Sequence, residues 1–139
     1  MRRRAKKPTI YSTGEVWSDI DHRFVKDSVG ALKKAVNVQS VYTSIDNILR
    51  TQKGERVMLP QFASDIHGMM FEPLNQASVS FLTKGIKDTI EFWDSRVRIE
   101  EVSIGRDPDR NTLSIALVFM IQGYSEAFQY ETPITGEYP

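Results

Sequence analysis

The sequence predicts an α+β fold in which two or three helices pack against a small antiparallel sheet. Apolar residues recur every three or four positions over residues 38–50 and again over 76–93, the spacing of one buried helix face. After Ser95 the apolar period changes to two, which is typical of strands. Helices followed by consecutive strands favour an α+β domain over an alternating parallel α/β sheet.

The first expected helix runs from Val38 to Arg50, with Asn37 or Ser40 as the residue that caps its start. Thr51 and Gly54 bracket its end, because glycine can adopt the positive φ that reverses a chain. The sequence therefore predicts a 13-residue helix followed by a tight polar turn.

Two further helices are expected after the rigid loop at Pro60. The first is a short helix over Ser64–Met70. Ser64 is expected to cap its start, and Pro73 is expected to end it. The second covers Gln76–Trp93, with Asn75 as its cap, and has the strongest helical period in the chain.

The remaining residues predict a β-hairpin and one more strand. Alternation begins at Val97 and slips by one position at Glu100–Glu101, which predicts a β-bulge. Residues 107–111 have the composition of a turn, and the strands on its far side are expected over 112–122 and 128–134. One face of the long strand is apolar: Leu113, Ile115, Leu117, Phe119 and Ile121.

Residues 1–36 are expected to form a basic N-terminal arm and an extended segment, ahead of a single α+β domain over 37–139. Residues 8–36 contain several large apolar side chains without a regular period: Trp17, Ile20, Phe24 and Val25. Exposed side chains of this kind are a liability. We therefore expect the segment to lie over the domain, with these side chains buried there or against a partner.

Composition restricts the class of protein. The chain has 139 residues, no cysteine and equal numbers of basic and acidic residues, 18 of each. Disulfides and thiolate metal sites are therefore excluded, and an intracellular origin is expected. No apolar run is long enough for a signal peptide or a membrane span.

The net charge of zero hides an asymmetry. Five basic residues lie within the first seven positions, which leaves 13 basic against 18 acidic residues in the rest of the chain, a net charge of −5. Such a segment either contacts an acidic partner, nucleic acid or protein, or is a solvated tail. The aromatic pattern of a single-strand nucleic-acid binder is absent, which disfavours nucleic acid.

Motifs of catalysis or metal binding are weak. Asp107-x-Asp109-x-Asn111 copies the start of an EF-hand loop but lacks its later glycine and glutamate, so a hairpin turn is the better interpretation. His22 and His67 have no metal-ligand spacing. Several carboxylates could form a glycosidase pair in principle, although no spacing specifies one: Glu55, Asp65, Glu72, Asp88, Glu91 and Asp94.

An ordered set of motifs covers the chain from about Trp17 to Ile134. It begins with Trp17-Ser18-Asp19-Ile20-Asp21 and continues through the first helix, a polar turn and a Pro-x-Phe loop. The turn and loop positions are Thr51, Lys53, Gly54, Arg56, Pro60 and Phe62. In this order and spacing the chain resembles the gene 25-like family of contractile phages, the baseplate wedge subunits or sheath initiators, in its T-even-like form.

Two positions depart from the family pattern. The family's glycine after the loop phenylalanine is Ala63 here, so we expect the backbone there to avoid positive φ. The family's Glu-Pro-Arg motif falls on Asp94, Ser95 and Arg96, which keeps the charges and loses the proline. From the residues alone this corner is either a local ion pair or a charged projection offered to a partner.

The resemblance implies a non-enzymatic structural role without a cofactor, in a fold like the strand-exchange domain of a sheath protein. Such a subunit links the wedge to the tail sheath and initiates sheath polymerisation by accepting strands. By resemblance, Asp94, Ser95 and Arg96 would contact the helical core bundle of the wedge. The expected strand-pairing residues are Leu113, Ile115, Leu117, Phe119 and Tyr130.

The expected partners are baseplate wedge proteins, the tail sheath protein and the tail tube, with no membrane. The expected location is the tail baseplate of a virion that assembles in the host cytoplasm. The alternative function is a small lysozyme-like peptidoglycan hydrolase of the tail, because relatives have been labelled in that way.

Overall fold

A computed structural model describes residues 17–135, apart from His22, Asp27, Asp65, Met70, Phe71, Pro108 and Asn111. Residues 1–16, which include most of the expected basic arm, lie outside the described residues. The elements in chain order are β1 (Ser18–Ile20), β2 (Lys34–Val36), α1 (Val38–Arg50), α2 (Ile66–Met69), α3 (Gln76–Trp93), β3 (Val97–Asp107), β4 (Thr112–Ile121) and β5 (Ala127–Thr135).

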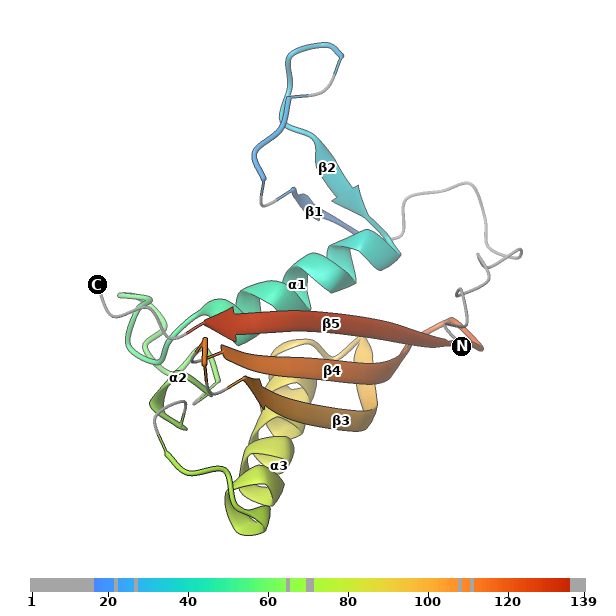
Figure 1. Cartoon of the computed structure of the whole chain (residues 1–139). Helices are drawn as coiled ribbons and strands as arrows, with labels where there is room; N and C mark the ends of the chain where they lie inside the picture. The colour runs from blue at the N-terminus through green and yellow to red at the C-terminus, as the bar shows by residue number, and fades with distance from the viewer. Residues whose placement is uncertain are drawn as a thin grey trace.

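The main body has two layers, a three-stranded antiparallel sheet and the helices that cover one of its faces (Figure 1). The strand order is β3-β4-β5, with β4 in the centre. In Figure 1, α3 crosses behind the sheet and α1 runs alongside β5, and among the described residues no helix lies on the viewer's side of the sheet. This architecture confirms the predicted α+β class.

The core forms between α1, α3 and the inward face of the sheet. The five apolar residues predicted on one face of the long strand are all buried, and they meet helix residues such as Ile45 and Ile90. Burying a large aliphatic or aromatic side chain contributes roughly 1.5–3 kcal/mol, so this contact dominates the stability of the body. No helix within the described residues is long and apolar enough to span a membrane.

Both long helices have the predicted bounds, but their N-termini differ. Asn75 caps α3 as predicted, in a reciprocal capping box with Ser78. The capping prediction for α1 is wrong in its chemistry. Asn37 occupies the cap position at φ 49°, yet its side chain accepts the backbone N–H of Trp17, and Ser40 Oγ donates to the Asn37 carbonyl.

The predicted details of the β-hairpin are confirmed. The register of β3 against β4 shifts between Ile99 and Glu101, which places a β-bulge at Glu100. Among the EF-hand-like residues, Asp107 and Asp109 lie at the hairpin turn, where Asp107 Oδ1 accepts the backbone N–H groups of Asp109 and Arg110 at 3.1 and 3.3 Å.

The short helix α2 is smaller than the predicted Ser64–Met70. It covers Ile66–Met69, and Ser64 lies two residues before it. The Ser64 side chain is buried and donates to the Leu49 carbonyl at 3.4 Å, so it ties this segment to the end of α1.

The described part of the N-terminal segment, residues 17–36, does not lie over the sheet, so that prediction is wrong for these residues, and burial of their side chains against a partner stays a prediction. Strands β1 and β2 pair with each other in an antiparallel hairpin, which points away from the sheet (Figure 1). We call residues 17–36 the N-terminal hairpin. Trp17, Ala35 and Asp21 are buried or half-buried, whereas Ile20, Phe24 and Val25 are exposed. The two short strands pair with each other, so the hairpin forms without pairing with the main sheet.

Candidate functional site

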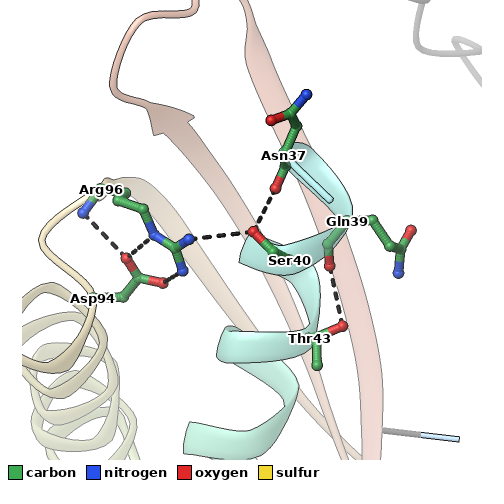
Figure 2. Close-up of polar contacts among 6 residues, drawn as sticks. All are labelled: Asn37, Gln39, Ser40, Thr43, Asp94 and Arg96. Atoms are coloured by element: carbon green, nitrogen blue, oxygen red, sulfur yellow. Dashed lines mark hydrogen bonds and ion pairs between the residues drawn. The ribbon is translucent and has the colours of Figure 1, made fainter. Parts of the chain in front are cut away.

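The corner between α3 and β3 contains a buried ion pair. Asp94 is the C-terminal cap residue of α3, and Arg96 lies just before β3. Figure 2 shows that the Arg96 guanidinium turns back onto the Asp94 carboxylate, with Nε and Nη2 donating to Oδ1 and Oδ2 at 2.8 and 2.6 Å. The backbone N–H of Arg96 donates to the same carboxylate at 3.1 Å. This bidentate geometry is the strong form of an arginine–carboxylate pair.

The pair also ties the corner to α1 and to the N-terminal hairpin. Arg96 Nη1 donates to Ser40 Oγ at 3.2 Å, and Ser40 passes a hydrogen bond on to the Asn37 carbonyl at 2.7 Å (Figure 2). The Arg96 guanidinium also lies 5.6 Å from the ring centre of Trp17. One arginine therefore holds three segments that are far apart in the sequence.

Burial and charge act in opposite directions on this carboxylate. Burial alone would raise the pKa of Asp94, but hydrogen bonds from Arg96 and Ser44 and the positive charge of Arg96 outweigh it, so the pKa lies below its ordinary value. The same contact with Asp94 raises the pKa of Arg96. Both side chains are therefore charged at neutral pH.

The corner does not project charge outward. The Asp94 side chain is only 3 % exposed and that of Arg96 is 24 % exposed, whereas Ser95 between them is exposed. The geometry is that of a local ion pair, one of the two interpretations that the sequence left open. Contact of these three residues with the wedge core stays a prediction, and Ser95 is the residue best placed to make it.

Residues 51–62, which carry the family's turn and loop motif and which we call the motif turn, form a compact loop after α1 that is held by local hydrogen bonds. Thr51 Oγ1 donates to the Asn47 carbonyl at 2.6 Å, and Gly54 adopts φ +87° while its N–H donates to the Pro60 carbonyl at 2.9 Å. The positive φ explains the glycine. Lys53 lines a cavity between this loop and α3.

Stacked side chains fix this loop against the end of α3. The Arg56 guanidinium lies 4.0 Å from the ring centre of Phe62, and that ring packs edge-on to Trp93 at 4.9 Å. Trp93 directly precedes Asp94, so the motif turn and the corner form one continuous region. The sequence identified both motifs but not their contact.

The prediction that the backbone at Ala63 avoids positive φ is wrong. Its φ is +134°, so the backbone keeps the conformation that favours glycine although the residue is alanine. Its neighbours explain why: Phe62 packs edge-on against Trp93, and the Ser64 hydroxyl donates to the Leu49 carbonyl. These two attachments fix the chain on both sides of Ala63.

The predicted strand-pairing residues fall into two groups. β4 pairs with β3 on one side and β5 on the other, so the prediction that it offers free backbone groups is wrong. The side chains of its predicted residues, Leu113, Ile115, Leu117 and Phe119, belong to the core. Tyr130 lies on β5, which within the described chain pairs with β4 alone and is therefore an edge strand.

Tyr130 points inward from that edge strand. Its hydroxyl donates to Asp46 of α1, which also pairs with Arg50 at 2.8 Å, and Arg50 donates to Thr132 at 2.8 Å. Burial and the bond to Asp46 raise the pKa of Tyr130 to about 12. The sequence analysis missed this link between α1 and β5. The i, i+4 spacing of Asp46 and Arg50 was its one visible signal.

The described carboxylates do not assemble a hydrolytic site. Glu91 accepts the Ile99 backbone N–H and Glu55 that of Gln52, so both have local structural roles. Three cavities in the described part are each lined by one carboxylate or none. Asp65 lies outside the described residues. Within the described residues no cluster of three histidine, cysteine or acidic side chains could hold a metal ion.

Comparison with known proteins identifies relatives for most of the chain. Residues 35–125 match the family described as "Baseplate wedge protein gp25". The curated baseplate wedge protein gp25 of Enterobacteria phage T4 is 22 % identical over 107 residues, which cover 77 % of this chain and 81 % of that protein.

Two solved structures share the fold. A protein from Geobacter sulfurreducens, provisionally named a tail lysozyme, has a TM-score of 0.64 and 25 % identity, covering 71 % of this chain and 90 % of that one. A chain of the anti-feeding prophage baseplate has a TM-score of 0.61 and 16 % identity, covering 88 % and 87 %.

Proposed function

This chain belongs to the baseplate wedge protein gp25 family, and we propose that it joins the wedge to the tail sheath and initiates sheath polymerisation by accepting a strand. It is a structural baseplate protein of a contractile tail. The proposed partners are the helical core of the wedge, the first sheath subunits and the tail tube. The proposed place is the virion baseplate, after assembly in the host cytoplasm.

The observation that carries the proposal is the edge of β5 (Ala127–Thr135). The Gln129 carbonyl accepts a hydrogen bond from the Tyr42 hydroxyl at 3.1 Å, so it points away from β4. Because N–H and C=O of one strand residue point to the same side, Glu131 and Pro133 share this outward direction. Proline at such a position is typical of an edge strand. Backbone groups near Glu131 therefore face away from β4, which is the side on which an incoming strand would pair.

A proline at Glu131 tests the role of this edge. Glu131→Pro removes an outward N–H without removing a bond to β4, and Glu131→Ala, which keeps that N–H, is the matched control. We expect Glu131→Pro baseplates to assemble but to carry no polymerised sheath in electron micrographs, while Glu131→Ala baseplates carry normal sheaths. Normal sheath on Glu131→Pro baseplates would refute acceptance of a strand at this edge.

We further propose that the Asp94–Arg96 corner docks the protein to the wedge through its exposed residue, Ser95. A bulky charge there, in Ser95→Arg, should abolish co-purification with wedge proteins while leaving the ion pair intact. Ser125→Arg, at an exposed turn elsewhere, is the control. Unchanged wedge binding by Ser95→Arg would remove this role from the corner.

We favour a non-enzymatic protein over a peptidoglycan hydrolase. The hydrolase alternative is supported by the name given to the Geobacter protein. Glycoside hydrolysis needs two facing carboxyl groups, and each described cavity is lined by at most one. Purified protein should therefore give no clearing in a peptidoglycan zymogram, and clearing that one carboxylate substitution abolishes would overturn this choice.

A further inference from the structure

The N-terminal hairpin carries an apolar surface that the body does not cover. Five of its large apolar side chains are between 47 % and 88 % exposed: Ile20, Phe24, Val25, Val29 and Leu32. Basic residues accompany them, with Lys26 and Lys33 both exposed. A two-stranded hairpin is marginally stable by itself, and so many exposed apolar residues mark an interaction surface.

Within the described part of the chain, no helix or strand covers the side of the sheet opposite the helices, which we call the outer face. Its central row along β4 is small or apolar, unlike the charged rows of most solvated strands: Thr112, Ser114, Ala116, Val118 and Met120. Shallow cavities open at both Ser114 and Ala116. Two exposed carboxylates flank the row across the register, Glu101 opposite Val118 and Glu131 opposite Ala116.

Charge is also divided along the chain. Residues 1–36 contain nine basic and four acidic residues, a net charge of +5, of which the hairpin itself contributes four basic and three acidic residues. Residues 37–139 contain nine basic and 14 acidic residues, a net charge of −5. Opposite net charges of this size favour attraction between the N-terminal part of one molecule and the body of another.

A molecule cannot satisfy both surfaces by folding back on itself in the observed conformation. The N-terminal hairpin leaves the start of α1 and points away from the sheet, while the outer face is turned toward the viewer (Figure 1). We propose that the hairpin of one copy docks on the outer face of a second copy. Apolar side chains such as Phe24 would cover the small-residue row, and Lys26 and Lys33 would face Glu101 and Glu131.

This contact is head-to-tail, because each copy contributes a different surface. In an open assembly, such a contact leaves one hairpin unused at one end and one outer face unused at the other. The assembly closes into a ring when the rotation between neighbouring copies permits it. The inference goes beyond the proposed function: it uses side chains of the outer face and not the backbone edge of β5, and its test variants leave Glu131 unchanged, so either proposal can fail alone.

Paired variants of the full chain test this arrangement. Lys26→Glu/Lys33→Glu disables the hairpin and leaves the outer face intact. Glu101→Lys/Ala116→Arg disables the outer face and leaves the hairpin intact. Sedimentation velocity should show concentration-dependent self-association of the wild-type protein, weakened by added salt, and a dissociation constant raised at least about tenfold in either variant.

A mixture of the two variants distinguishes this contact from any symmetric one. One intact hairpin can still dock on one intact outer face, so the mixture should form a discrete one-to-one dimer that does not grow. Phe24→Asn tests the apolar part: asparagine tolerates the φ of 51° seen at this residue, so the variant should keep the hairpin and lose association.

Three outcomes would overturn the proposal. The first is a wild-type chain that stays monomeric at all accessible concentrations. The second is that either variant self-associates as tightly as the wild type, or that the mixture of the two variants forms no dimer. The third is binding of the hairpin to a DNA oligonucleotide without self-association, which would assign the basic surface to nucleic acid. Circular dichroism of each variant verifies that it is folded.

Discussion

Removing Arg96 should destabilise the whole domain. The Arg96→Met variant would leave the Asp94 carboxylate, whose side chain is 3 % exposed, without its bidentate partner. Breaking a buried pair by removing one partner costs roughly 3–5 kcal/mol, against a total stability of roughly 5–15 kcal/mol for a domain. With a urea slope of about 2 kcal/mol per molar, the unfolding midpoint should fall by about 1.5–2.5 M.

A double variant isolates the uncompensated charge as the cause. Asp94→Leu/Arg96→Met removes both charges and replaces them with apolar side chains, which is often close to neutral. It should therefore recover most of the loss seen in Arg96→Met. If the double variant is as unstable as the single one, the cost comes from the contacts to Ser40 and Trp17 and not from the buried carboxylate.

Acid titration gives an independent reading of the same pair. Because the pKa of Asp94 is lowered in the folded state, its contribution is fully present above the ordinary value of about 3.8 and is lost as pH falls through the folded pKa. As pH falls from about 5 to the folded pKa of Asp94, which lies below 3.8, the free energy of unfolding of the wild-type protein should therefore decrease more steeply than that of the double variant. Parallel acid unfolding curves would contradict the assignment of a lowered pKa to this carboxylate.

Three further predictions test other parts of the fold. Ala63→Gly should leave stability unchanged or raise it by up to about 1 kcal/mol, because relief of a strained φ offsets the lost methyl group, whereas Ala63→Val should lower the melting temperature clearly. Tyr130→Phe should cost about 1.5–3 kcal/mol through the lost bond to Asp46. Since burial and that bond raise the pKa of Tyr130 to about 12, wild-type stability should be fully present below about pH 10 and fall between pH 10 and 12, and Tyr130→Phe should lack that fall. Phe119→Ala should cost roughly 3–5 kcal/mol in urea unfolding, while Val57→Ala, at a position 92 % exposed, should change stability by less than about 0.5 kcal/mol.

Much of the body could be predicted because its signals are local. The periods over residues 38–50 and 76–93 report which helix face is buried, and the structure has helices with those bounds. The bulge at Glu100 was visible as a slip in alternation, since one inserted residue moves every later side chain to the other face. Each of these features depends on neighbours within one or two turns of the chain.

Features that depend on distant contacts could not be predicted. The alternation of β4 reports a buried face equally well for a central or an edge strand, so the central position had no signal in residues 112–121. The φ of Ala63 is set by what Phe62 and Ser64 contact elsewhere, which no local preference reports. The strands of the N-terminal hairpin have only three residues each, too few to establish a period.

The buried corner also changes how docking to the wedge must be tested. The family resemblance places Arg96 at a contact with the wedge, which would make Arg96→Ala the obvious test of docking. In the structure Arg96 holds Asp94, Ser40 and Trp17 together, so its removal would disturb the corner whether or not any partner binds there. A loss of wedge binding in Arg96→Ala would therefore carry no information about contact. Ser95→Arg alters the exposed residue of the same corner and leaves the buried pair in place, so it separates contact from folding.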